Sequence, residues 1–136
     1  MKVEVRYYSK TGNTEKLAKV IAEAVGVEAK DISVPVDEAD ILFLGTSVYA
    51  YGIASDAKDF IKTLDPQRVG KIVSFSSAAL VESAYPMMQK LASNEGLVLA
   101  EDEFHCRGQF MSVHKGKPDE ADLIAAANFA KNIVEA

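Results

Sequence analysis

Val3-Glu4-Val5-Arg6-Tyr7-Tyr8, followed by Ser9-Lys10-Thr11-Gly12-Asn13-Thr14, is the stretch of sequence that decides the fold. Its first half is mostly β-branched or aromatic, a composition typical of a strand. From Glu15 to Val25, apolar residues recur at helical spacing and predict a helix with one apolar face. The chain therefore runs from a strand, through a polar loop, into the N-terminus of a helix.

The loop between this strand and helix is rich in groups that bind anions. Ser9, Thr11 and Thr14 carry hydroxyls, Asn13 carries an amide, and Gly12 has no Cβ to obstruct the backbone. The first turn of a helix adds N–H groups without intrahelical partners. One such side chain would be enough for a helix cap alone. Because the loop has neither the P-loop pattern nor Gly-x-Gly-x-x-Gly, we predict a site for a single phosphate monoester.

Tyr7-Tyr8-Ser9-Lys10-Thr11-Gly12-Asn13-Thr14 resembles the FMN phosphate loop of the flavodoxin family, whose pattern is Thr/Ser-x-Thr-Gly-x-Thr after the first strand. The stretch Phe104-His105-Cys106-Arg107-Gly108 is similar to the Cys-x-Gly stretch of many flavodoxin-domain proteins. The resemblance implies non-covalently bound FMN as the cofactor. It also implies electron transfer, with a reductase and an electron acceptor as redox partner proteins.

Apolar runs and helical patterns alternate along the rest of the chain. We expect further strands near 30–34, at 41–45, at 71–75 and from 97 toward 106, with a weak helix between the second and third strands. We expect a helix capped by Ser55 or Asp56, a helix after 76–79, and a helix that starts near Pro118. The alternation predicts an α/β fold with a parallel sheet covered on both faces. We expect one domain over 1–136, a flavodoxin-like three-layer sandwich with five parallel strands in the order 2-1-3-4-5.

In such a sheet the ligand lies at the carboxyl ends of the strands, where the winding reverses. The loops after the first, third and fourth predicted strands meet at that edge. The candidate FMN-binding residues are Ser9, Lys10, Thr11, Gly12, Asn13, Thr14, Thr46, Ser47, Val48, Tyr49, Ala50, Tyr51, Gly52, Ser76, Ser77, Ala78 and Ala79.

The flavin ring needs apolar cover on its faces and hydrogen-bond donors along its pyrimidine edge. Tyr49 and Tyr51 are the aromatic residues of the two ring-facing loops, and we expect one of them, with Tyr51 favoured, to stack on the ring. The main-chain N–H groups of 76–79 are expected to serve the pyrimidine edge. In many flavodoxins a glycine in the second loop lets a peptide flip and hydrogen-bond N5 of the reduced flavin. The resemblance implies this role for a peptide at Ala50, Tyr51 or Gly52.

Composition limits the other possibilities. With 15 basic and 20 acidic residues the net charge is −5, which argues against nucleic acid as a partner. No run of 18 apolar residues and no charged-then-apolar leader is present, so we expect a cytoplasmic protein without a membrane span, either a monomer or a weak dimer.

Cys106 is the single cysteine, which excludes an internal disulfide, and we expect it to act as a small buried apolar residue. His105 and His114 lack a third ligand at suitable spacing, so no metal site is predicted.

Two questions stay open at the level of sequence. The chain could be an FMN-dependent oxidoreductase on the same fold, similar to quinone reductases or protoporphyrinogen oxidases, although no catalytic residue stands out. A receiver domain is disfavoured, because Ser9 stands where acids are needed after the first strand. Glu4 and Arg6 lie on one face of a strand that should be buried on both faces. They could pair with each other or with Asp40, or mark an open edge or an oligomer contact.

Overall fold

The computed structural model describes residues 1–49, 52–79, 83–109 and 114–136. The elements are β1 (Val3–Tyr7), α1 (Asn13–Val25), β2 (Ala29–Asp31), β3 (Ala39–Tyr49), β4 (Gly52–Ile53), α2 (Ser55–Lys62), β5 (Val69–Ala78), α3 (Tyr85–Asn94), β6 (Phe104–Arg107) and α4 (Glu120–Glu135). Five parallel strands follow the order β2-β1-β3-β5-β6, which confirms the predicted order of the sheet. The short β4 is an addition to it and pairs antiparallel with the end of β3.

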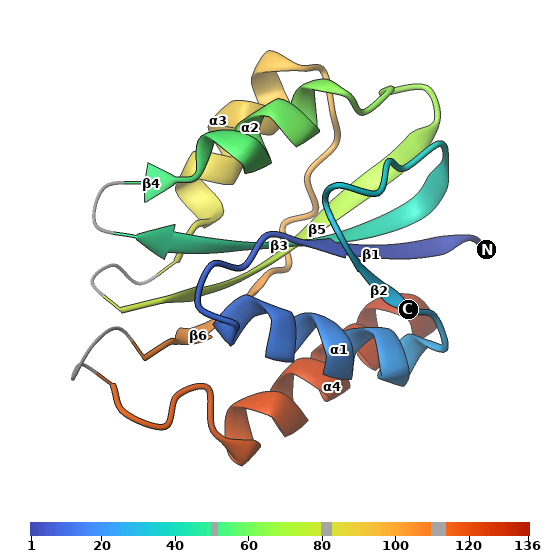
Figure 1. Cartoon of the computed structure of the whole chain (residues 1–136). Coiled ribbons are helices and arrows are strands. Elements are labelled where there is room, and N and C mark those ends of the chain that lie inside the picture. Colours follow the sequence, from blue (N-terminus) through green and yellow to red (C-terminus); the bar gives the residue numbers. More distant parts are fainter. Residues whose placement is uncertain (50–51, 80–82, 110–113) are drawn as a thin grey trace.

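Helices cover both faces of the sheet, as the alternating pattern predicts. In Figure 1, α1 and α4 lie on one face, and α2 and α3 lie on the other. Strand β3 supplies both cores, because successive side chains of a strand point to opposite faces. Phe43 packs in the core that includes Leu17 of α1, and Leu44 packs in the core that includes Phe60 of α2.

The segment between β2 and β3 differs from the prediction, because the described chain forms no helix there. Arg6, only 2% exposed, supports this coil from below. Its guanidinium donates hydrogen bonds to the carbonyl oxygens of Val34 (2.8 Å) and Pro35 (3.0 Å), and it forms an ion pair with Glu4 (3.0 Å). Glu4 and Arg6 therefore pair with each other, whereas Asp40 accepts a hydrogen bond from the backbone N–H of Lys2.

The last predicted strand is also different, because it is interrupted. Leu99 forms an isolated parallel bridge with Ile72, and regular pairing resumes only in β6 against the end of β5. In the gap, the carbonyl of Ala100 accepts a hydrogen bond from the hydroxyl of Tyr85 (2.8 Å). The apolar pattern from 97 to 99 thus marks the approach to the edge strand rather than its body.

Two helices begin close to the predicted positions but with different caps. Ala54 occupies the N-cap of α2, so neither Ser55 nor Asp56 caps it. Helix α4 begins at Glu120, two residues after Pro118, and Asp119 caps it in a capping box with Asp122. Within the described residues, no helix combines the length and apolar character needed to cross a bilayer.

Candidate functional site

The loop from β1 to α1 leaves the first turn of α1 open. Gly12 is the N-cap in a left-handed conformation (φ 90°), and no side chain caps the helix there. Its backbone N–H donates to Ser9 Oγ (2.9 Å), which closes the loop on itself. A Cβ at Gly12 would meet nothing within 4 Å, and Lys10 and Thr11 beside it are exposed. The helix N-terminus therefore has room for an anion, and its donors suit a phosphate.

Thr14, in the first turn of α1, is fully buried and holds the helix to the sheet. Its hydroxyl lies 2.6 Å from Ser47 Oγ on β3 and 2.9 Å from Ser77 Oγ on β5, and it donates to the carbonyl of Thr46 at 3.3 Å. These contacts join three of the predicted site segments. The Thr14 hydroxyl therefore bonds to the sheet, whereas the sequence predicted that it would bind an anion.

Two glycines allow this close approach of helix and sheet. A Cβ at Gly45 would overlap the ring of Phe75 and lie 2.8 Å from Thr14 Cγ2. A Cβ at Gly108 would lie 2.9 Å from Asn13 Nδ2. Asn13 is buried, and its amide donates to the carbonyl of Gln109 at 2.9 Å, so it braces the segment after β6 rather than only the loop.

The segment 46–52 is largely strand. Thr46, Ser47 and Val48 are buried in β3, and the described chain offers the hydroxyl of Thr46 no hydrogen-bond partner. Tyr49 ends β3 and pairs with Gly52 of β4. The side chain of Tyr49 and the whole of Ala50 and Tyr51 lie outside the described residues, so the stacking of a tyrosine on the flavin stays a prediction.

The prediction of a loop at 76–79 is wrong for all but its last residue. Ser76, Ser77 and Ala78 are the buried end of β5, paired with β3 on one side and with β6 on the other. Only Ala79 leaves the strand. Its carbonyl accepts a hydrogen bond from Arg107 (3.4 Å) and lies 3.2 Å from His114 Nε2. Small hydroxyl residues suggested a loop, but here the hydroxyls are satisfied inside the fold.

A family model described as "Flavodoxin domain" matches residues 4–117. The chain belongs to the flavodoxin domain family. No curated protein sequence matches it.

Solved structures of flavodoxins share the fold of this flavodoxin-domain protein. A flavodoxin from the domain Archaea superposes with a TM-score of 0.81 at 21% identity, covering 99% of this chain and 97% of that one. Oxidised Flavodoxin 2 from Bacillus cereus gives 0.73 at 19% identity, with 99% of both chains covered. Two-electron reduced Megasphaera elsdenii flavodoxin gives 0.70 at 22% identity, covering 98% and 99%.

Members of the family bind FMN and transfer electrons to redox partners, and this chain is an FMN-binding electron-transfer flavoprotein. Bound FMN supplies the redox chemistry. The open N-terminus of α1 fits its phosphate, because backbone donors there have no side-chain cap to compete with the ligand.

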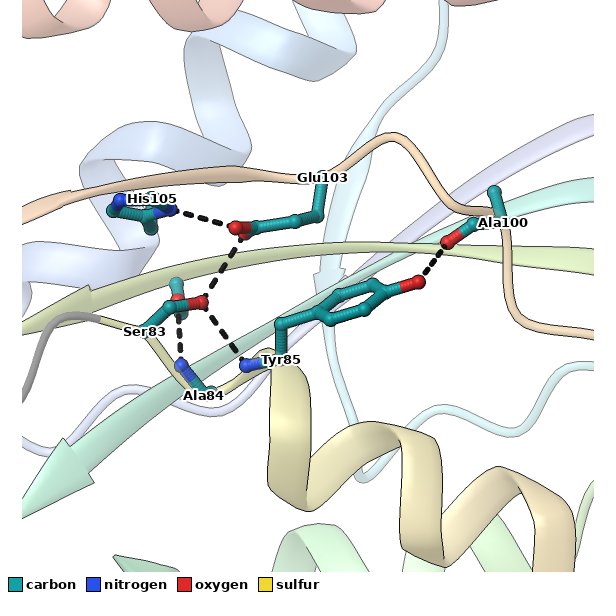
Figure 2. Close-up of polar contacts among 7 residues, drawn as sticks. Ser83, Ala84, Tyr85, Ala100, Glu103 and His105 are labelled. Carbon is teal, nitrogen blue, oxygen red and sulfur yellow. Dashed lines mark hydrogen bonds and ion pairs between the residues drawn. The ribbon is translucent and has the colours of Figure 1, made fainter.

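Away from the loop between β1 and α1, a polar network fixes the start of α3 in this flavodoxin-domain protein (Figure 2). Glu103 lies between Ser83, whose hydroxyl donates to it at 3.3 Å, and His105, whose Nδ1 is 2.6 Å from the carboxylate. Ser83 also accepts from the backbone N–H of Tyr85 (3.0 Å). Burial and the nearby Glu101 raise the pKa of Tyr85, which therefore remains a donor to Ala100 at neutral pH. Sequence reasoning missed Ser83 and Glu103, which no local motif marks.

Cys106 of β6 packs as a small apolar residue against the core beneath α1 and α4, but it is half-buried rather than buried as expected. Burial, with a smaller contribution from Asp122, raises the pKa of its thiol to about 12. The thiol therefore stays protonated at neutral pH and is a poor nucleophile.

A groove of about 460 Å³ opens next to Tyr8, which precedes the loop from β1 to α1. Apolar surface from Ile32, Pro35 and Phe60 forms part of its lining. Three carboxylates, together with hydroxyls, complete the lining, which comprises Tyr8, Asp31, Ile32, Ser33, Pro35, Asp56, Asp59, Phe60 and Thr63. The groove is thus partly apolar and acidic, and it exists where no helix follows β2.

Proposed function

We propose that the whole chain, 1–136, acts as a single domain in which residues 9–14 hold the FMN phosphate. The observation that carries this is the open first turn of α1, with Gly12 at the N-cap and no capping side chain. Backbone N–H groups are the main donors, with exposed Thr11 beside them. Thr14 acts from below, by fixing the helix on Ser47 and Ser77.

The flavin ring, in this proposal, lies over the carboxyl ends of β3 and β5. Residues 46–52 and 76–79 supply its surroundings, with Tyr49 or Tyr51 covering one face. Because Ser76, Ser77 and Ala78 belong to β5, Ala79 is the residue of this segment whose main chain lies outside a strand. Fluorescence quenching of FMN in Tyr49→Ala and Tyr51→Ala variants tests this ring placement, and unchanged quenching in both would contradict it.

Replacing Thr11 with glutamate tests the phosphate site. The new carboxylate would stand at the N-terminus of α1, where it repels the phosphate and competes for the same donors. We expect FMN affinity to fall at least tenfold, about 1.4 kcal/mol. Riboflavin, which lacks the phosphate, should bind the variant and the wild type equally. The measurement is a fluorescence titration of each flavin into the apo protein.

Lys19→Gln provides the matched control, because it changes net charge by the same amount on the exposed side of α1. It should leave both affinities within about twofold, since an exposed charge beyond a Debye length is largely screened. If Thr11→Glu weakened the binding of riboflavin as much as that of FMN, the loop would not bind the phosphate, and the proposed placement would be wrong.

The finer identity of the redox partners is also a proposal. A reductase and an electron acceptor in the cytoplasm would exchange electrons with the bound FMN. We propose that the docking surface of these proteins is basic. Asp31, Asp56 and Asp59 in the groove beside Tyr8 support this, because their negative charge lies at the same edge of the sheet as the cofactor loop.

Electron transfer from the reduced holoprotein to a basic cytochrome c measures this attraction. The Asp56→Asn/Asp59→Asn variant should lower the second-order rate at low ionic strength by about threefold or more and flatten its salt dependence. Asp37→Asn/Glu38→Gln removes the same charge from the pair that contacts Arg68. If the two variants had equal effects, the groove would act only through the net charge of the protein, and it would not be the docking surface.

A further inference from the structure

One face of α4 carries an apolar centre flanked by opposite charges. Glu120, Ile124, Ala127 and Lys131 are spaced by four, three and four residues, so they form one stripe along the helix. Ile124 is 55% exposed, one of four large hydrophobic side chains exposed in the described chain. All four stripe residues line a groove of about 510 Å³ between α1 and α4, together with Val20, Glu23, Ala24 and Leu123.

The stripe is self-complementary. The point midway between Glu120 and Lys131, between Ala125 and Ala126, is also midway between Ile124 and Ala127. If a second α4 lay antiparallel across this point, Glu120 of each copy would face Lys131 of the other. Ile124 would face Ala127, a large residue against a small one. The two charges are about 16 Å apart along the helix, so neither obstructs the apolar centre.

We propose that the α1–α4 groove, centred on Ile124, is the contact surface of an antiparallel dimer between two copies of this chain. A contact of this kind is isologous, since the same patch serves both copies. Its charge pattern favours a second copy as the occupant, because the order acid, apolar, apolar, base is complementary to its own reverse, which pairs each acid with a base. A contact of a single helix face is at the small end of protein interfaces, so the dimer is weak and concentration-dependent.

The location is compatible with electron transfer. The stripe lies on the face of the sheet covered by α1 and α4, away from α2 and α3 (Figure 1). The α1 residues of the groove are Val20, Glu23 and Ala24, which lie seven or more residues beyond the first helical residue, Asn13. The dimer therefore leaves the cofactor loop and the acidic groove beside Tyr8 exposed in both copies.

Sedimentation velocity on the full chain, over a concentration series, tests the proposal. Glu120→Lys alone places lysine against Lys131, and Lys131→Glu alone places glutamate against Glu120, so each variant should weaken self-association at least tenfold. An equimolar mixture of these two variants restores both charge pairs in the heterodimer. We expect the mixture to associate within about threefold of wild type. Misfolding of either variant could not produce this rescue.

Lys62→Glu on α2, on the opposite face of the sheet, is the control and should leave association unchanged. Ile124→Glu should give a monomer at all concentrations. A wild-type chain that remains monomeric up to about 1 mM would overturn the proposal, since weaker contacts lie below the range of specific complexes. A mixture of Glu120→Lys and Lys131→Glu that associates no better than its components would overturn it equally.

Discussion

Replacing Arg6 with alanine is expected to lower the free energy of unfolding by about 3–5 kcal/mol, the range for breaking one side of a buried ion pair. The guanidinium is almost completely buried and has four hydrogen bonds, to Glu4 and to the carbonyls of Val5, Val34 and Pro35. Alanine would leave the coil carbonyls and the Glu4 carboxylate without this donor. It would also leave a void beneath the coil that follows β2.

Urea unfolding of the apo protein measures this loss. Amide exchange should accelerate at Val34, whose N–H donates to the carbonyl of Asp31 at the end of β2. Glu4→Gln is the matched control, because an amide oxygen can still accept from Arg6, and it should cost no more than about 1 kcal/mol. If Arg6→Ala were as stable as Glu4→Gln, the coil would not depend on the guanidinium.

The second large effect is expected from Gly45→Ala, at about 3 kcal/mol, the upper end for overpacking a core. The added methyl would overlap the Phe75 ring and press on Thr14. Because Thr14 fixes the first turn of α1, the variant should also bind FMN more weakly than the wild type. Thermal unfolding of the apo protein and an FMN titration together measure the two consequences.

A double-mutant cycle with Phe75→Leu separates overlap from other effects of the alanine. Leucine removes the ring edge that the new methyl would meet. Gly45→Ala should therefore cost less in the Phe75→Leu background, with a coupling energy of about 1 kcal/mol or more. Additive losses would mean that the methyl is accommodated by another route, and that Gly45 is not needed for the approach of α1.

The sheet order was predictable because alternating strand and helix patterns restrict the topology strongly. The turn from β1 into the uncapped N-terminus of α1 was predictable because its residues are contiguous, from Ser9 to Thr14. The contacts of Thr14 were not, since Ser47 and Ser77 lie 33 and 63 residues away. The same distance explains why Ser76 and Ser77 resembled a loop: a hydroxyl-rich run indicates exposure unless its distant partners are known.

Arg6 is the clearest example of a contact that could not be predicted from the sequence. A charged residue in a central strand conflicts with burial on both faces. Its charge is resolved by carbonyls from a coil 28 and 29 residues further along the chain. A helix between β2 and β3 would have engaged its interior carbonyls in its own hydrogen bonds, so the buried arginine and the missing helix are two aspects of one arrangement.

Oxygen atoms of Thr46 and Ser47 on β3 and of Ser77 on β5 are hydrogen-bond partners of the Thr14 hydroxyl. The first turn of α1 is consequently held in place before any phosphate arrives, and binding requires little ordering of the backbone. A chain built in this way can be synthesised and folded ahead of its cofactor and loaded afterwards. The apo form is then a folded reserve. The amount of protein that can transfer electrons depends on the supply of FMN rather than on the rate of protein synthesis.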